Sequence, residues 1–146
     1  MNRETVDVGD EGIVLDVEIE VFDKLKSFHF MIDTGAAVTV IDEGVMRRIG
    51  YTPVDSIGEA YALTASKLEP VYRYEIDNLT ALGVTKRNLH VISHKLPETL
   101  DIDGLLGLNF FDKTTLKIEL DLPKANIELI ENKVVTHTPT ANDINP

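Results

Sequence analysis

Cysteine and tryptophan are absent from this chain of 146 residues, and aromatic residues make up only 6% of it. Without cysteine, the chain can form no disulfide, no thiolate nucleophile and no cysteine-based zinc site. With so few aromatic side chains, we expect no stacking platform for nucleic-acid bases. Basic residues are also scarce, and the formal net charge of -11 repels phosphate backbones and anionic lipids. Nucleic acid is therefore not an expected partner.

Long apolar runs are missing too. No stretch approaches the length of a membrane span, so we expect no membrane partner for this chain. The first residues, MNRETVDVGDEG, are polar and acidic and lack the apolar core of a signal peptide. These absences favour a cytoplasmic protein, although a trimmed form of an anchored or exported protein would show the same sequence.

What is present is a pattern of short strands. The composition, 43% hydrophobic and 27% charged, is that of an ordinary globular domain. Apolar residues alternate with polar ones, which indicates strands with one wet face. The predicted strand and hairpin segments are 12–23, 24–33, 37–42, 59–77, 79–93, 114–121 and 125–131. The first two form a hairpin through the region of Phe22 to Lys24, and the last two turn at 122–124.

One segment breaks the alternation. In DEGVMRRIG, Asp42 can cap a short helix, Arg47 and Arg48 suit its C-terminal end, and Gly50 suits a left-handed stop. We therefore predict an all-β fold, a small closed or curled β-barrel with one or two short helices. Residues 1–131 form one domain in this interpretation, and residues 132–146 form a flexible C-terminal tail because they are polar and aperiodic.

The segment FHFMIDTGAAVTVID, residues 28–42, places an acid among apolar residues. An ionised Asp33 in a buried strand costs several kcal/mol unless donors surround it. The nearest candidate donors are the Thr34 hydroxyl and the backbone N–H groups of Gly35 and Ala36. A hydrogen-bonded turn would explain these residues equally well, because Asp-Thr-Gly alone arises by chance in many chains.

The wider pattern resembles the active-site signature of aspartic proteases, in which two apolar residues precede Asp, Thr or Ser, Gly, and Ala or Ser. A second element of that family, two apolar residues and a glycine, is matched by Leu105, Leu106 and Gly107 in DGLLGLNFF. The helix-like segment lies between them in the same order. The resemblance covers residues 12–130. Since DTG occurs once, the chain looks like the single-domain, retropepsin-like branch.

The resemblance implies an aspartic endopeptidase in which Asp33 is catalytic. It implies that Thr34, Gly35 and Ala36 shape the site. Leu105, Leu106 and Gly107 would support the loop by packing. Family chemistry uses two carboxyl groups about 3 Å apart that share a proton and activate a water. One chain supplies one such group, so the second is Asp33 of another copy in a two-fold homodimer. No metal and no organic cofactor is implied.

The resemblance also implies a flap that closes over an extended peptide or protein substrate. Chain order places it within residues 59–74, with its tip near Thr64 to Lys67. Its candidate substrate-binding residues are Tyr61, Thr64, Ala65 and Ser66, although a plain packing role is favoured for Tyr61. Family flap tips are commonly glycine-rich, whereas this chain has no glycine between Gly58 and Gly83.

That departure leaves an alternative to catalysis open. The same fold would serve as a non-catalytic dimerisation or peptide-binding module. A flexible tail at residues 132–146 would also suit a processing enzyme that is active only within a larger precursor or beside a membrane partner.

The histidines do not predict a metal site. His90 and His94 have the spacing of paired ligands on a helix, but on a strand this spacing separates them by about 13 Å. His29 is interpreted as a strand residue that faces away from Phe30. Asp103, which precedes a glycine, is interpreted as part of a turn.

Overall fold

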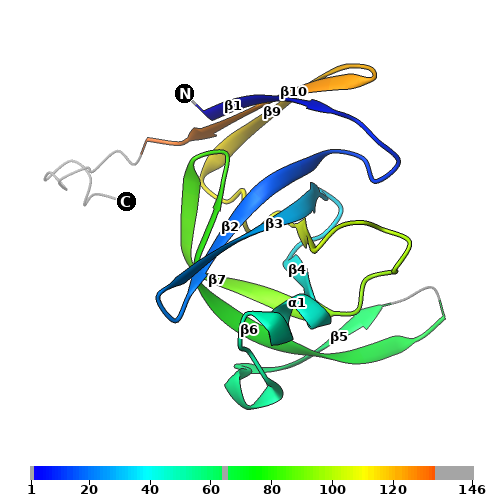
Figure 1. The fold of residues 1–146 in the computed structure, drawn as a ribbon, viewed down its shortest axis with the longest axis vertical. Helices are drawn as coiled ribbons and strands as arrows, with labels where there is room; N and C mark the ends of the chain where they lie inside the picture. Colours follow the sequence, from blue (N-terminus) through cyan, green and yellow to red (C-terminus); the bar gives the residue numbers. More distant parts are fainter. Residues whose placement is uncertain (1, 64–65, 134–146) are drawn as a thin grey trace, which may run out of the picture.

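The computed structural model describes residues 2–63 and 66–133 (Figure 1). These residues form ten strands, one short α-helix, α1, and one 3-10 turn, η1. Their bounds are β1 Asn2–Asp7, β2 Val14–Val21, β3 Lys24–Ile32, β4 Thr39–Asp42, α1 Glu43–Arg48, η1 Pro53–Asp55, β5 Gly58–Leu63, β6 Leu68–Ala81, β7 Val84–His94, β8 Gly104–Leu106, β9 Thr114–Asp121 and β10 Lys124–Glu131. Within the described ranges, no helix has the length and apolar character needed to span a bilayer.

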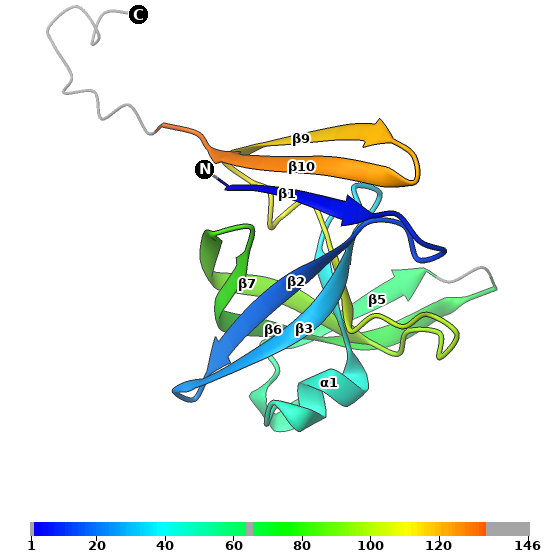
Figure 2. The same cartoon turned by 45° about the horizontal axis from the view of Figure 1, so that its top comes forward.

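Most strands form one closed barrel. They follow the order β2-β3-β8-β4-β7-β6-β5, and β2 also pairs with β6 along Val17 to Glu20. That extra pairing closes six strands into a ring and leaves β5 outside it, attached to β6 (Figures 1 and 2). The predicted small closed β-barrel with a short helix is confirmed.

Two tight turns bring consecutive strands of the barrel together. Phe22 and Asp23 join β2 to β3 with φ of 50° and 61°, and Leu82 and Gly83 join β6 to β7 with φ of 49° and 73°. Two consecutive residues with positive φ match the right-handed twist of the flanking strands. The hairpin predicted through Phe22 is therefore confirmed.

The barrel interior is filled by the apolar face of each strand. In β2, Leu15, Val17, Ile19 and Val21 are buried, while the acidic residues between them are exposed. The largest fully buried side chains are Phe30, Phe110, Leu15, Ile19, Ile41, Met46, Ile76, Leu79, Leu106, Ile127, Leu129 and Val17. Met46 comes from α1, whose N-terminus is capped by the Asp42 carboxylate as predicted.

A second, three-stranded sheet lies beside the barrel in the order β1-β10-β9 (Figure 2). Its inner face buries Ala125, Ile127 and Leu129. The sequence analysis did not predict β1, because NRETVD has a single apolar residue and no apolar alternation. Its pairing with β10 supplies the order that its own sequence does not encode.

Asn132 is the first residue of the predicted tail. It is held against the domain: its N–H donates to Lys113 O at 2.9 Å, and its Oδ1 accepts from the Thr115 hydroxyl at 2.9 Å. The flexible tail over residues 132–146 stays a prediction. Residues 134–146, which make up most of the predicted tail, lie outside the described residues.

Candidate active site

The Asp-Thr-Gly segment forms a loop between β3 and β4. β8 is inserted between these two consecutive strands, parallel to β3 and antiparallel to β4. Asp33 follows the last residue of β3, and its N–H donates to Leu106 O at 3.0 Å. The two segments that the sequence separates by about seventy residues therefore lie against each other.

The Asp33 carboxylate is half-buried and held by one donor. The Gly35 N–H donates to Asp33 Oδ1 at 2.9 Å, whereas the Ala36 N–H donates to the main-chain carbonyl of Asp33 at 3.2 Å. The Thr34 side chain is exposed, and its hydroxyl has no hydrogen-bond partner among the described residues. Of the three predicted donors, only Gly35 reaches the carboxylate.

The Leu105–Gly107 element braces this loop. Leu106 is fully buried and Leu105 partly buried. Just beyond them, the Leu108 N–H donates to Ala36 O at 2.8 Å and the Asn109 N–H donates to Ala37 O at 3.1 Å. The loop is thus bonded to this segment at its start and near its end.

Gly107 is the closest point of that contact. A Cβ at this residue would lie 2.5 Å from the carbonyl carbon and 2.6 Å from the carbonyl oxygen of Val38. No side chain fits in that space without moving the backbone of the loop. The need for glycine here is therefore steric.

A hydrogen-bond network around the buried Thr39 was not predicted. The Thr39 hydroxyl donates to Asn109 Oδ1 at 2.8 Å and accepts from the Gly107 N–H at 3.1 Å. Asn109 Oδ1 also accepts from the Thr39 N–H, and Asn109 Nδ2 donates to His90 O at 2.7 Å. The signal in the sequence was a threonine on the inward face of a β-branched strand, with an asparagine two residues after Gly107.

The predicted flap is a hairpin of β5 and β6, in which Leu63 faces Leu68. Thr64 and Ala65, placed at its tip by the sequence, lie outside the described residues; Ser66 is exposed. Tyr61 is 68% exposed, so the packing role favoured for it is wrong. It alternates with Ala60 and therefore points to the opposite face of the hairpin.

A hollow of about 360 Å³ lies between the loop and the base of this hairpin. It is lined by Val38 from the loop, Ala60 from β5, Arg73 from β6, and His90, Val91 and Ile92 from β7. The loop that carries Asp33 and the hairpin thus share one depression on the protomer surface.

His29, His90 and His94 lie in strands, as predicted. On β7, His90 Nε2 lies 3.8 Å from Glu75 Oε2, and His94 Nε2 lies 3.1 Å from Glu69 Oε2. His29 Nδ1 lies 3.0 Å from Asp16 Oδ1, on the exposed side of β3. Across residues 2–63 and 66–133, no three or more histidine or acidic side chains are grouped to hold a metal ion.

Asp103 lies outside the Asp33 loop and contacts the segments on either side of it. Its Oδ2 accepts from the His29 N–H at 2.9 Å, and Oδ1 lies 3.8 Å from Arg48. Its main-chain carbonyl accepts from the Asp42 N–H at 2.8 Å. It therefore links β3 to the start of α1.

Comparison with known proteins agrees with this geometry. The family described as "gag-polyprotein putative aspartyl protease" matches residues 17–113. Among solved structures, the chain is similar to a retropepsin-like aspartic protease from Rickettsia conorii, with a TM-score of 0.63 over 86% of this chain and 89% of that chain. The identity is 17%, so this similarity shows the fold alone. No curated protein matches the chain. Because the family match spans more than half of its residues, the chain belongs to the retropepsin-like aspartyl protease family.

Proposed function

We propose that this protein is an aspartic endopeptidase that hydrolyses peptide bonds as a homodimer, with Asp33 of each copy as the catalytic group. The observation that carries the proposal is the state of Asp33. Its loop is bonded to the end of β8 at its start and to the segment after β8 near its end, yet Asp33 is only half-buried and its carboxylate has a single donor. The loop carries no second carboxylate, so an identical loop is the natural source of one.

In such a pair, two carboxyl groups close together share one proton, and their apparent pKa values belong to the pair. The ionised group accepts a proton from the water that attacks the peptide carbonyl. The protonated group donates to the carbonyl oxygen, and a proton is later delivered to the departing amine. Because the copies are identical, substrate binding decides which Asp33 takes which role.

Thr34 and Gly35 support this arrangement. The Thr34 hydroxyl is exposed and has no hydrogen-bond partner in the described part of the protomer, which leaves it available to bond the main chain of a second copy. The Gly35 N–H keeps one carboxylate oxygen fixed at 2.9 Å. Together they would hold the paired carboxylates in a constant orientation.

The substrate proposed is an extended peptide under the β5–β6 hairpin. The hollow between loop and hairpin is lined by Val38, Ala60 and Ile92 at its apolar side. An extended peptide would gain affinity from main-chain hydrogen bonds and specificity from such depressions.

The first test is the Asp33→Asn variant. We expect it to cleave an unstructured protein substrate at no measurable rate at any pH, because the amide cannot act as a base. Its circular dichroism spectrum and melting temperature should stay close to those of the starting protein. Cleavage by the purified variant would remove the mechanism.

The second test addresses the pairing. The parent protein and Asp33→Asn are mixed in equal amounts and allowed to exchange subunits. The mixture should then retain about one quarter of the activity that the same total amount of protein would show if all of it were parent, since only active–active dimers cut. Retention of about one half would mean that each chain acts alone. Gel filtration of the mixture checks that dimers have formed.

The alternative, a non-catalytic dimerisation or peptide-binding module, is favoured by one observation. The β5–β6 hairpin contains no glycine after Gly58, so its opening would be stiff. A protein that binds unstructured peptides at all pH values and releases them uncut would support this alternative.

A further inference from the structure

The hollow beside the Asp33 loop carries the opposite charge to the protein as a whole. Acidic residues outnumber basic ones by 25 to 14 in this chain. The side chains that line this hollow of about 360 Å³ nevertheless include Arg73 and His90, and no acidic side chain of the described residues lines it. The hollow is therefore a local basic site on an acidic protein.

Arg73 has no partner for its charge. It is an exposed residue of β6, and its guanidinium makes no ion pair or side-chain hydrogen bond within residues 2–63 and 66–133. Its neighbours across the sheet are Gly58 on β5 and Ile92 on β7, and neither has a side chain that can form a hydrogen bond. A guanidinium presents its donors in a planar fork that matches the two oxygens of a carboxylate. Arg73 is therefore free to bind an acidic group from outside the protomer.

Gly58 keeps the space beside Arg73 open. Residues that face each other on paired strands project to the same side of the sheet, so a side chain at residue 58 would lie next to Arg73. A Cβ at Gly58 would meet no heavy atom within 4 Å. Ala60, the next residue of β5 on that face, adds only a methyl group. A side chain of a bound peptide therefore has room to approach the guanidinium.

The hollow is fixed in place against the Asp33 loop. Val38, which lines it, belongs to the loop and follows Asp33 by five positions. Asn109 joins the other wall to the same loop: its Nδ2 donates to His90 O at 2.7 Å, and its N–H donates to Ala37 O at 3.1 Å. A peptide that lies over the loop would therefore pass beside this hollow.

Glu75 does not neutralise the hollow. It lies two residues after Arg73 on the same face of β6, but it does not line the hollow. Its Oε2 lies 3.8 Å from His90 Nε2, so its nearby cation is His90 when that ring is protonated. Arg73 is thus the group that supplies a permanent positive charge to the hollow.

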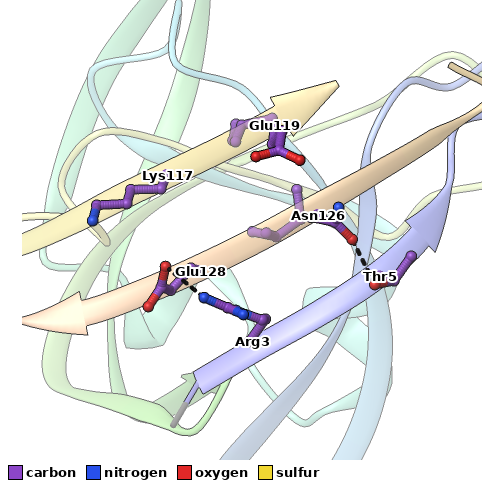
Figure 3. A pocket seen from close by; sticks show the side chains of 8 residues that line it. Arg3, Thr5, Lys117, Glu119, Asn126 and Glu128 are labelled. Atoms are coloured by element: carbon purple, nitrogen blue, oxygen red, sulfur yellow. Dashed lines mark hydrogen bonds and ion pairs between the residues drawn. The ribbon is translucent and has the colours of Figure 1, made fainter. Parts of the chain in front are cut away.

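The hollow on the outer face of the three-stranded sheet provides a contrast (Figure 3). It has a volume of about 550 Å³, and its basic side chains, Arg3 and Lys117, are accompanied by Glu119 and Glu128. Arg3 lies 3.3 Å from Glu128. The formal charges of that hollow cancel, so no charged ligand is indicated there.

We propose that Arg73 recognises an acidic side chain of the peptide substrate, whose carboxylate binds in the hollow while the adjoining main chain lies over the Asp33 loop. This inference rests on the proposed function and deepens it, because it names a substrate with Asp or Glu at a fixed distance from the cleaved bond. The proposed homodimer has two equivalent hollows, so the preference should occur at corresponding positions on both sides of the cut.

The net charge of -11 does not prevent this recognition. Repulsion between the peptide and distant carboxylates is largely screened beyond about 8 Å at physiological ionic strength. A carboxylate in direct contact with Arg73 is screened much less, and paired hydrogen bonds to the guanidinium add to the attraction.

Matched peptides test the role of Arg73. Short unstructured peptides are made in pairs that differ only by Glu or Gln at one position, and each position on both sides of the cut is examined in turn. At the recognised positions, the parent should cleave the Glu peptide with a kcat/KM about tenfold higher than the Gln peptide. Arg73→Glu should abolish this preference and favour Lys at the same positions, whereas Arg73→Gln should abolish it without favouring Lys.

Arg87→Glu is the matched control. It makes the same charge change at an exposed residue of β7 that does not line the hollow, so it should keep the preference of the parent for Glu. Circular dichroism establishes that each variant is folded. Equal cleavage of the Glu and Gln peptides by the parent at every position, or a preference that persists in Arg73→Glu, would overturn the role of Arg73 and leave the proposed function in place.

Binding separates this inference from the proposed function. Fluorescence anisotropy with the Asp33→Asn protein, which should leave the peptides intact, should show about tenfold tighter binding of the Glu peptide than of the Gln peptide. Arg73→Glu in the same background should bind the two equally or favour the Gln peptide. A parent that cuts no peptide while this binding pattern holds would remove the proposed function and keep recognition by Arg73. Equal affinities of the Asp33→Asn protein for the two peptides would overturn that recognition.

Discussion

Thr39 shows how a single buried residue positions the candidate site. It is the polar residue in the buried set of the described chain, and its hydroxyl joins two segments that are far apart in sequence. Gly107 is buried, and the Thr39 hydroxyl is the acceptor for its N–H among the described residues. The Asp33 loop is therefore supported by a hydrogen bond between Gly107 and Thr39, neither of which belongs to the Asp-Thr-Gly motif.

Replacing Thr39 tests this role. Thr39→Val keeps the side-chain shape and leaves the Gly107 N–H unsatisfied, so we expect a loss of about 1–3 kcal/mol in the free energy of unfolding. Thr39→Ser keeps the hydroxyl and should lose less. Urea denaturation of the two variants provides the comparison. Equal stability of Thr39→Val and the parent would show that the hydroxyl is not needed.

At the scale of elements, the hairpin of β5 and β6 is held to the barrel by few contacts near its end. Glu69 lies on β6 close to the tip, and its Oε2 is 3.1 Å from His94 at the end of β7. The hydrogen bond with His94 lowers the pKa of the Glu69 carboxyl below its ordinary value, with a further contribution from Lys67. Because the pKa of Glu69 is lowered, this contact stabilises the hairpin at pH values above the ordinary pKa of a glutamate. The stabilisation is lost as the pH falls through the lowered pKa.

The Glu69→Gln variant should therefore loosen the hairpin. We expect amide hydrogen exchange in β5 and the first residues of β6 to become a few-fold faster at neutral pH, with little change in β2 and β3. Glu59→Gln, on the neighbouring strand and without an ion pair in the described residues, is the matched control. Identical exchange in both variants would show that the contact with His94 does not restrain the hairpin.

Some secondary-structure elements could be predicted from the sequence, and others could not. β2, β3 and the turn between them were predicted because alternation and turn chemistry are properties of neighbouring residues. β8 has three residues, and nothing local indicates that it enters between β3 and β4. β1 is polar and is a strand only because β10 pairs with it. The one-donor environment of Asp33 likewise depended on loop geometry that the motif does not specify.

For the whole molecule, stability should decline at alkaline pH. Tyr51 follows α1, packs edge-on against Tyr74, and donates from its hydroxyl to Glu75 O at 3.3 Å. Burial, followed by the nearby Asp77, Asp55 and Glu75 carboxylates, raises the pKa of Tyr51 to about 12. A raised pKa means that the unfolded chain loses this proton first, so stability is full below pH 10 and falls as the pH rises towards about 12.

We expect this change to reach roughly 2 kcal/mol by the upper end of that range. Denaturation at a series of pH values should show a shallower decline for Tyr51→Phe than for the parent. Some decline should remain, because burial also raises the pKa of Tyr74. Parallel curves for the two proteins would show that Tyr51 does not account for the effect.

The order of amino acids is sufficient for the barrel class, the helix after the Asp33 segment and the family resemblance, because each depends on short-range periodicity or on a motif in one stretch. Folding in three dimensions decided which distant segments meet: β8 between β3 and β4, Thr39 against Asn109, and β1 on β10. It also made β9 an edge strand, with β10 as its one strand partner in the described residues. The physical reason is that long-range pairing depends on the competition among all strands for partners, and no single stretch of sequence contains that competition.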